Sequence, residues 1–267
     1  MVVAGATGMA AAAAHGFAAE GARILVTSRT AEHARALAAA IEAEGGRCRW
    51  LAAELTREAD ADAVIEACVS AYGRVDGAYT VAGISGRRYG DGPLHEMTLA
   101  GWQAVMEGNA TSTFLVCRSA VRQMLRQERD DDGMRGAIVT MSSVLALHPS
   151  PDHFATHAYA ASKGAIIAFS RALASYYAPD GIRVNVIAPA LVATPMSRRA
   201  QDDPAILAYL HAKQPLAGGP IDPAATVGVA VFLLSRDARM VTGQVMEVDA
   251  GWGISEPGRR PGESERR

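Results

Sequence analysis

The sequence predicts an α/β fold, a doubly wound parallel sheet of about seven strands covered by helices in a single domain. Short β-branched runs alternate along the chain with longer, Ala-rich amphipathic stretches, and this alternation is typical of βαβ units. The predicted strands are almost continuously apolar, as expected when both faces of a sheet are covered. No segment of roughly 20–50 residues repeats, so a solenoid or propeller is not indicated.

Each element follows from its local pattern. Strands are predicted at residues 2–3, 23–27, 47–51, 77–81, 136–141, 183–188 and 244–248. Helices are predicted at residues 9–20, 31–44, 58–72, 99–127, 157–177 and 223–234. A short helix is predicted at 205–213 inside residues 196–219, a natural mobile lid whose Leu207, Tyr209 and Leu210 could equally be ordinary packing. The Asp-rich segment 129–133 is predicted as a solvated loop. The domain is expected to cover residues 1–254, and the Gly-, Pro-, Arg- and Glu-rich tail 255–267 is expected to be disordered.

Composition and charge narrow the possible functions. The 267 residues carry 26 Lys and Arg against 28 Asp and Glu, a formal net charge of −2, so a nucleic-acid partner is not expected. No apolar run reaches the roughly 18 residues of a membrane span, so no membrane association is expected. Three scattered cysteines, Cys48, Cys68 and Cys117, indicate neither a disulfide framework nor a zinc site, and they favour a cytoplasmic location.

Two glycines after the first predicted strand mark a candidate nucleotide site. Gly5 and Gly8 open an Ala-rich helix, where backbone N–H groups and the helix dipole could bind a pyrophosphate. Small residues also begin helices for packing reasons, so this signal alone leaves both interpretations open. The second strand ends at Ser28-Arg29 and not at an acidic residue, which favours the 2′-phosphate of NADP(H) over NAD(H). The alternative is an exposed arginine at a helix start.

A second cluster of polar residues suggests acid–base chemistry. Tyr159 and Lys163 lie four residues apart, on one face of a predicted helix. A nearby cation should lower the pKa of a phenol from its usual value of about 10. Lys163 is one of only two lysines among 26 basic residues, which argues against a chance pair. Ser143 follows a predicted strand at the carboxyl edge of the sheet, where open α/β sheets bind ligands, and Asn109 lies in the preceding long helix.

With further motifs, these residues resemble the short-chain dehydrogenase/reductase family from residue 1 to about residue 254. The motifs are Gly5 to Gly8, Asn109-Ala-Thr-Ser-Thr-Phe, Met141-Ser-Ser143, Tyr159-x-x-x-Lys163, Gly181-Ile-Arg-Val-Asn-Val-Ile-Ala-Pro189, Thr194-Pro-Met and Val241-Thr-Gly-Gln with Val248-Asp-Ala-Gly251. The resemblance implies a Rossmann-type fold. It also implies an NADP(H)-dependent oxidoreductase that interconverts a ketone or aldehyde and an alcohol of a small-molecule substrate by hydride transfer.

The resemblance further assigns roles to single residues. Tyr159 would be the general acid and base, and Ser143 the hydrogen-bond partner of the substrate oxygen. Lys163 would hold the nicotinamide ribose and lower the pKa of Tyr159, and Asn109 would support a water-mediated proton relay through Lys163. The residues expected to contact the cofactor are Gly5, Thr7, Gly8, Met9, Ser28, Arg29, Glu54, Leu55, Ala82, Gly83, Tyr159, Lys163, Pro189, Val192 and Thr194. A homo-oligomer, dimer or tetramer, would pair through the helices that hold Asn109 and Tyr159.

The glycine motif departs from the family pattern. The family usually has the run Thr-Gly-x-x-x-Gly-x-Gly. If this run is aligned through Gly8, its first and last glycines are Ala4 and Ala10 here. If it is aligned through Gly5 to Gly8, its last glycine is Ala11. An alanine there would weaken cofactor binding if the position needs a positive φ or a close approach, and it would be harmless in a helix. Few residues precede these glycines, so the first strand is expected to be short and a start further upstream stays open.

Other cofactor elements differ as well. The acidic residue expected near the adenine is Glu54 where the family has Asp, and Pro189-Ala190 replaces Pro-Gly. The usual Asn-Asn-Ala-Gly after the fourth strand is Thr80-Val81-Ala82-Gly83, which lacks two side-chain amides that join neighbouring strands. These departures keep two alternatives open: a non-redox partner subunit with a weakened cofactor site, and a dehydration or isomerisation in which Tyr159 still acts as acid and base.

The segment between Ser143 and Tyr159 is longer than usual for the family. The two residues are sixteen positions apart, so residues 145–156 are predicted to form an enlarged loop over the substrate crevice. His148, His153 and His157 lie in or beside this loop, but no carboxylate joins them at helical ligand spacing, and no metal site is expected. The loops at 84–96, 145–156 and 196–219 would select the substrate, and their sequences do not identify it.

Overall fold

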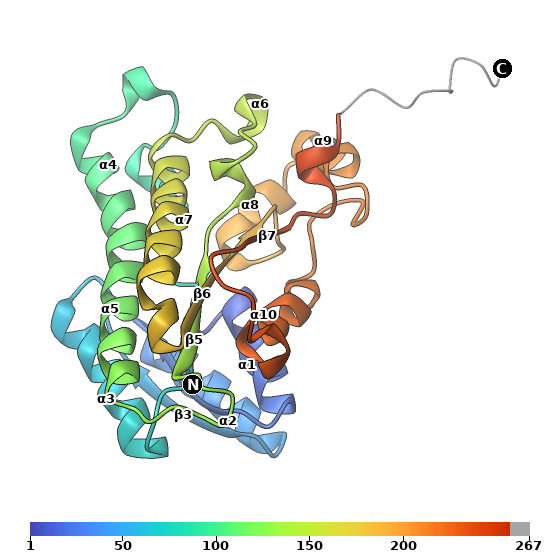
Figure 1. The fold of residues 1–267 in the computed structure, drawn as a ribbon. Helices are drawn as coiled ribbons and strands as arrows, with labels where there is room; N and C mark the ends of the chain where they lie inside the picture. Colours follow the sequence, from blue (N-terminus) through green and yellow to red (C-terminus); the bar gives the residue numbers. More distant parts are fainter. Residues whose placement is uncertain (257–267) are drawn as a thin grey trace.

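Residues 1–256 of the computed structural model form a parallel sheet with helices on both faces (Figure 1). The sheet has seven strands in the order β3-β2-β1-β4-β5-β6-β7, and every neighbouring pair is parallel. The doubly wound α/β fold predicted from the sequence is confirmed. The tail was predicted to be disordered, and its residues 257–267 lie outside the described part of the chain.

All seven strands lie where they were predicted, and no end differs by more than one residue. They are β1 (Val2–Ala4), β2 (Arg23–Ser28), β3 (Arg47–Ala52), β4 (Gly77–Thr80), β5 (Gly136–Met141), β6 (Ile182–Pro189) and β7 (Val245–Val248). Successive side chains point to opposite faces. In β1, Val2 and Ala4 therefore pack into one core cluster and Val3 into the other. Both faces are apolar because helices cover both of them.

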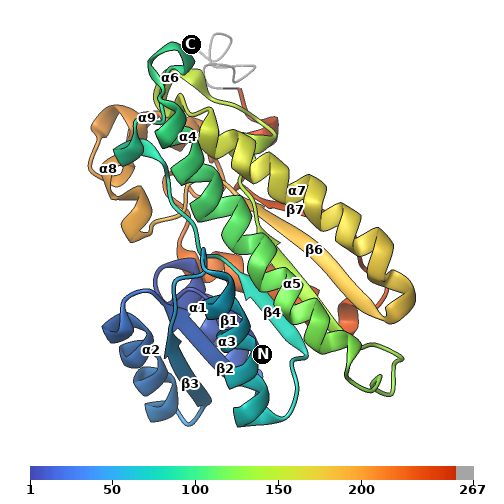
Figure 2. The same ribbon diagram turned by 90° about the vertical axis from the view of Figure 1, so that its left-hand side faces the viewer.

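The helices divide between these two faces. The helices α1 (Met9–Ala19), α2 (Ala31–Ala43) and α10 (Val227–Leu234) pack into the cluster that contains Val3. The helices α3 (Glu58–Tyr72), α5 (Ser112–Leu125) and α7 (Ala158–Tyr177) pack into the cluster that contains Val2. Figure 2 shows α5 and α7 lying over the strands β4 to β6.

Four further α-helices lie in the described part of the chain. They are α4 (Leu99–Met106), α6 (Pro151–Phe154), α8 (Arg198–Gln201) and α9 (Pro204–Lys213). The last of them confirms the short helix predicted at residues 205–213. Both views place α6, α8 and α9 toward the same end of the molecule (Figures 1 and 2), where their side chains share a small apolar cluster with Trp252.

The helix predicted at residues 99–127 is not continuous. A π-helical turn at Glu107–Thr111 separates α4 from α5, and it contains the fully buried Asn109. A π turn adds a residue to the helical repeat and is found mostly at functional sites. Apolar periodicity does not resolve a single added residue, so the sequence predicted one helix here.

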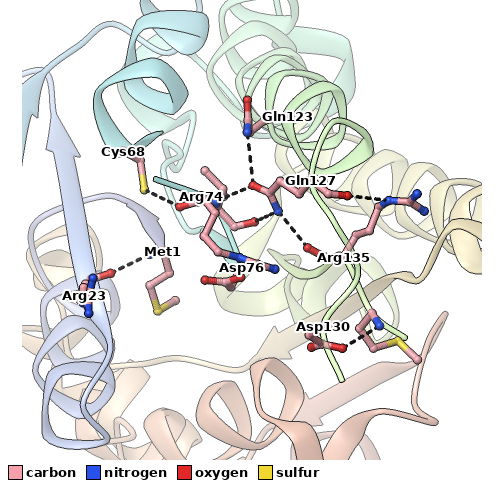
Figure 3. A network of polar contacts seen from close by, with 11 residues as sticks. Met1, Arg23, Cys68, Arg74, Asp76, Gln123, Gln127, Asp130 and Arg135 are labelled. Carbon is pink, nitrogen blue, oxygen red and sulfur yellow. Dashed lines mark hydrogen bonds and ion pairs between the residues drawn. The ribbon is translucent and has the colours of Figure 1, made fainter. Parts of the chain in front are cut away.

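A polar network fixes the amino-terminal edge of the sheet, at the opposite end of the strands from the site described below (Figure 3). The Gln127 side chain accepts a hydrogen bond from Val75 N at 2.6 Å and donates to the carbonyl oxygens of Val75 and Arg135, each at 3.1 Å. One amide therefore joins the end of α5 to the residues that precede β4 and β5. This buried, satisfied network holds the middle strands in register.

The three cysteines are free and buried, and burial raises the pKa of each thiol. None of them is therefore a reactive thiolate at neutral pH. Within residues 1–256, no helix combines the length and the apolar character needed to cross a membrane.

Candidate active site

The candidate site lies at the carboxyl edge of the sheet. Between β1 and β4 the strand order reverses, and open α/β sheets bind ligands in the crevice at such a point. A cavity of about 360 Å³ opens here, and Ser143, Tyr159 and Lys163 all line it. Its walls are mostly apolar and include Val144, Leu145, Phe154, Leu191, Met196 and Trp252.

Three elements bring the polar groups together. Ser143 lies in extended backbone two residues after β5, and its Oγ accepts a hydrogen bond from Leu145 N at 3.2 Å. Tyr159 lies in the first turn of α7 and Lys163 one turn later, with Lys163 Nζ 5.6 Å from the centre of the Tyr159 ring. The strand end and the helix start thus place a hydroxyl, a phenol and an ammonium group in one cavity, as the sequence predicted.

The electrostatics of this group differ from the expectation. Burial raises the pKa of Tyr159 above 10, and a hydrogen bond with Ser143 opposes this rise only in part. Burial also lowers the pKa of Lys163 to about 8. The pKa of Tyr159 is thus raised and not lowered as predicted, because burial disfavours the phenolate and Lys163 is not among the groups that offset this effect. Lys163 Nζ instead donates to the carbonyl oxygen of Met141 at 2.9 Å.

Asn109 connects the π turn to both sides of the site. Its Oδ1 accepts from Ile84 N at 2.7 Å, and its Nδ2 donates to Ile84 O at 3.1 Å and to Ser162 Oγ at 2.9 Å. The side chain thus joins the loop after β4 to the helix α7, which carries Tyr159 and Lys163. A side chain added at Gly83 would come within 2.6 Å of Asn109 Oδ1 and 3.5 Å of Lys163 Nζ, so this glycine keeps space beside both groups.

Asp91 is a residue of the site that the sequence analysis missed. It lies in the loop between β4 and α4, is only 3% exposed, and accepts hydrogen bonds from the backbone N–H groups of His157, Ala158 and Tyr159 at 2.8–3.0 Å. Thr156 Oγ1 also donates to it. Asp91 therefore caps α7 from 66 to 68 residues away in sequence. Its setting, Gly90-Asp91-Gly92, is that of an ordinary turn, so no local signal marks it.

The glycine loop retains the geometry that a dinucleotide needs. Gly5 and Gly8 both have positive φ, 142° and 55°, which an alanine would adopt only with strain. The N-terminus of α1 has no side-chain cap and no acidic residue in its first turn, so its N–H groups remain suited to a phosphate. A side chain on Gly8 would lie 2.8 Å from Thr194 Cγ2, which places Thr194 directly against this loop.

The alanines that replace family glycines are harmless to the backbone. Ala4 lies in β1, Ala10 and Ala11 lie in α1, and none of the three has a positive φ. Ala10 is 2% exposed, and its methyl group faces Gly5, where an added Cβ would lie 2.7 Å away. None of these alanines therefore needs a positive φ, which answers the question of backbone conformation left open by the sequence.

The predicted cofactor residues form a continuous line along the carboxyl edge. Those that line the cavity are Met9, Gly83, Tyr159, Lys163, Pro189, Val192 and Thr194. Those that lie outside it, around β1 to β4, are Gly5, Thr7, Gly8, Ser28, Arg29, Glu54, Leu55 and Ala82. Leu55 is only 6% exposed and its side chain packs into the core, so only its backbone can reach a ligand.

At the far end of this line, Arg29 and Glu54 face each other. Arg29 Nη1 lies 3.6 Å from Glu54 Oε2, and the Arg29 side chain is 59% exposed. Such an exposed pair contributes little to stability, so its guanidinium group is free to exchange partners. Ser28 Oγ accepts from Thr30 N at 3.2 Å and lies at the start of the same turn.

The missing amides after β4 are replaced in part by backbone contacts. Val81 N and Ala82 N both donate to Ala4 O, at 3.2 and 2.8 Å, and so hold β4 against β1. The buried Thr80 hydroxyl has no hydrogen-bond partner within the described chain. An unsatisfied buried hydroxyl of this kind costs about 1–3 kcal/mol.

The enlarged loop and the lid pack against each other. Residues 145–156 contain α6, and Ser150 Oγ lies 2.8 Å from Tyr209 Oη of α9. His148 Nε2 lies 2.8 Å from Glu247 Oε2, and His157 Nδ1 lies 2.7 Å from Gly92 O. The His153 ring contacts the Tyr209 ring in a tilted arrangement, with 4.8 Å between the ring centres. The three histidines thus have separate partners. Within residues 1–256, no three His, Cys, Asp or Glu side chains gather as metal ligands would.

Comparison with known proteins identifies the family. Residues 3–253 match a family model described as enoyl-(acyl carrier protein) reductase. The 3beta-hydroxysteroid dehydrogenase 1 of Eggerthella lenta is 36% identical over 247 residues, which cover 91% of this chain and 89% of that protein. The chain belongs to the short-chain dehydrogenase/reductase family. It is accordingly an oxidoreductase of the class that acts on CH–OH groups, and its substrate is a small molecule.

Solved structures of this family share the fold. A short-chain type dehydrogenase/reductase from Mycobacterium ulcerans has a TM-score of 0.85 at 26% identity, covering 96% of this chain and 90% of that one. A putative NAD(P)-dependent gluconate 5-dehydrogenase from Beutenbergia cavernae with bound NADP has a TM-score of 0.83 at 36% identity, covering 94% and 95%. Family membership and this neighbour indicate a nicotinamide cofactor, which the glycine loop fits.

Proposed function

We propose that the protein is an NADP(H)-dependent oxidoreductase that interconverts a ketone or aldehyde and an alcohol, with Tyr159 as general acid and base. One observation carries the proposal: the Ser143 hydroxyl, the Tyr159 phenol and the Lys163 ammonium group line one cavity at the carboxyl edge of the sheet. The glycine loop lies beside the same crevice, which supports binding of the cofactor there.

The chain's own residues supply the proton and the orientation. In reduction, the Ser143 hydroxyl donates a hydrogen bond to the substrate carbonyl, and the Tyr159 phenol donates a proton to the same oxygen as negative charge develops on it. The raised pKa of Tyr159 keeps the phenol protonated for this step. The nicotinamide, when bound, supplies the hydride in reduction and accepts it in oxidation. The apolar walls exclude water from the reacting carbon.

Lys163 and Asn109 support the proton transfer by Tyr159. Lys163 Nζ is nearly buried and lies one helical turn from the phenol, on the side where the cofactor ribose would be held. In oxidation the proton leaves Tyr159, and a relay through Lys163 and water at the π turn would carry it to solvent. The tie between Asn109 and Ser162 keeps the π turn against α7 during this step.

The preference for NADP(H) is supported by Arg29. Its guanidinium group is 59% exposed at the end of β2, and its partner Glu54 is 3.6 Å away. A 2′-phosphate carries more charge than Glu54 and would bind Arg29 through two parallel hydrogen bonds. Glu54 then lies beside the adenine end of the same site.

Titration of the protein with NADPH and NADH tests the proposal directly. Wild type should bind NADPH at micromolar concentration, and Arg29→Ala should lose about 10- to 100-fold of that affinity with little change for NADH. Arg49→Ala is the matched control, because it removes an exposed arginine of the neighbouring strand β3 that is paired with Glu42 of α2. If neither nucleotide binds, a non-redox partner role is favoured. If NADPH binds but product forms without its stoichiometric consumption, the reaction is an isomerisation or dehydration.

We also propose a cytoplasmic homo-oligomer. Phe114 on α5 and Tyr176 on α7 are 41% and 74% exposed, on the two helices expected to pair. Large exposed aromatic side chains of this kind favour an interface. Analytical ultracentrifugation should show a dimer or tetramer in wild type, and the double variant Phe114→Glu, Tyr176→Glu should shift the protein to monomer.

A further inference from the structure

The charged side chains that line the substrate cavity are all basic. Among the side chains that line it, the charged ones are Lys163 and three arginines, Arg87, Arg88 and Arg199, and no aspartate or glutamate lines it. The protein as a whole carries a formal net charge of −2. The concentration of positive charge in this cavity is therefore a local property, and clefts lined by one sign of charge attract ligands of the opposite sign.

Two of the arginines converge from different elements. Arg87 lies in a 3₁₀ turn (Arg87–Tyr89) of the loop after β4, and Arg199 lies in α8 of the lid. Both donate to the same carbonyl oxygen, His153 O, Arg87 at 3.1 Å and Arg199 more weakly at 3.5 Å. Each guanidinium group has five N–H donors, so one shared carbonyl leaves most of them available.

Neither arginine of this pair forms an ion pair with a carboxylate in the described part of the chain. Arg29, Arg49 and Arg236 each form an ion pair with a carboxylate, whereas Arg87 and Arg199 form none. Burial and repulsion by Arg199 lower the pKa of Arg87, and Asp91 opposes this only from a distance. Both Asp91 oxygens already accept hydrogen bonds from residues 156–159. Arg87 and Arg199 are both solvent-exposed and share one carbonyl oxygen. Their like charges at the cavity therefore form a place that attracts an anionic ligand.

We infer that the substrate is an oxyanion, a hydroxy or oxo compound whose carboxylate or phosphate is held by Arg87 and Arg199 while its reacting carbon faces Tyr159. This inference rests on the proposed function, because it assigns the substrate class of the same cavity. A planar carboxylate matches the fork of donors on each guanidinium group.

Paired probes test the inference. We follow the NADPH-dependent reduction of three compounds: 4-oxopentanoate, its neutral amide 4-oxopentanamide, and dihydroxyacetone phosphate. The proteins compared are wild type, Arg87→Met, Arg199→Met and Arg198→Met. Calorimetry on the NADP⁺-loaded protein measures binding of the same three compounds. Arg198 is the matched control, since it precedes Arg199 in α8 but does not line the cavity. NADPH affinity is measured in every variant.

We expect kcat/KM for the anion to exceed that for the amide by about 10- to 100-fold in wild type and Arg198→Met. Arg87→Met and Arg199→Met should lose this preference and keep their NADPH affinity. Preference for the oxo acid over the phosphate, or the reverse, identifies the oxyanion. If wild type uses the amide as well as the anion, the inference is overturned while the reductase function stands. The same holds if Arg87→Met and Arg199→Met lose NADPH affinity but keep the preference for the anion. If no probe is reduced, anion binding that disappears in Arg199→Met still supports the site, and absence of binding at millimolar concentration overturns it.

Discussion

The carboxylate of Asp91 accepts a hydrogen bond from the backbone N–H of Tyr159 at 2.8 Å, and so joins the loop after β4 to the catalytic helix. With the N–H groups of His157 and Ala158 it satisfies three of the four donors that the start of a helix leaves unpaired. Its negative charge also lies at the positive end of the α7 dipole. The position of the phenol is thus set by a residue remote in sequence.

Replacement of Asp91 should impair catalysis more than cofactor binding. In Asp91→Ala the start of α7 loses its cap, and we expect unfolding to become easier by about 1–3 kcal/mol. We also expect kcat to fall by at least about tenfold because Tyr159 is no longer held in place. Asp222→Ala, which removes the cap of the 3₁₀ turn before α10, should cost stability and leave kcat unchanged. An equal loss of kcat in both variants would show that Asp91 acts through stability alone.

Removal of the phenolic hydroxyl should abolish turnover without releasing the cofactor. Tyr159→Phe is expected to lower kcat by about 10²- to 10⁴-fold, the usual contribution of a positioned proton donor, while NADPH titration stays within about twofold. Tyr176→Phe, on the exposed side of the same helix, should match wild type. Retention of activity in Tyr159→Phe would require a different proton donor.

The two reaction directions should respond differently to pH. Because burial raises the pKa of Tyr159 above 10, the phenol stays protonated from pH 6 to 9, and kcat/KM for reduction should be nearly flat there. Oxidation needs the phenolate, so its kcat/KM should rise about tenfold for each pH unit from pH 7 to 9. A plateau for oxidation below pH 8 would mean that the pKa of Tyr159 is lowered in the cofactor complex, as the sequence first suggested.

Lys163 should make the free energy of unfolding depend on pH. Its pKa is lowered to about 8 in the folded protein from 10.5, so above pH 8 the unfolded state binds more protons at this site. Stability attributable to Lys163 should therefore rise between about pH 8 and 10.5, by on the order of 3 kcal/mol. Urea unfolding of wild type and Lys163→Met from pH 7 to 10 measures it. A difference between the two proteins that does not change with pH would contradict the prediction.

Gly8 should be needed for its close contact as well as for its conformation. Gly8→Ala adds a methyl group 2.8 Å from Thr194 at a φ of 55°, and we expect NADPH affinity to fall by at least about tenfold. Gly21→Ala also places alanine at a positive φ but meets nothing within 4 Å. That control should lose about 1 kcal/mol of stability and keep NADPH affinity. Equal NADPH binding by Gly8→Ala and wild type would show that Thr194 moves aside.

The structure decided how the departures from the family pattern affect the backbone of the glycine loop. Ala4, Ala10 and Ala11 could have strained the glycine loop or been harmless, and only the backbone angles decide between these outcomes. The pKa of Tyr159 was predicted with the wrong sign because spacing along a helix places a cation nearby but does not reveal how much water both groups lose.

The sequence by itself determined the strands and their parallel arrangement, and it predicted which groups would react. Apolar β-branched runs must be buried on both faces, and residues such as Ser143, Tyr159 and Lys163 lie at fixed positions on the strand end and helix that these runs imply. Only the tertiary structure decided which loop residues meet. The cap by Asp91, the convergence of Arg87 and Arg199, and the π turn at Asn109 depend on loop paths and on one added helical residue. Packing of the whole chain sets these features, and no local pattern encodes them.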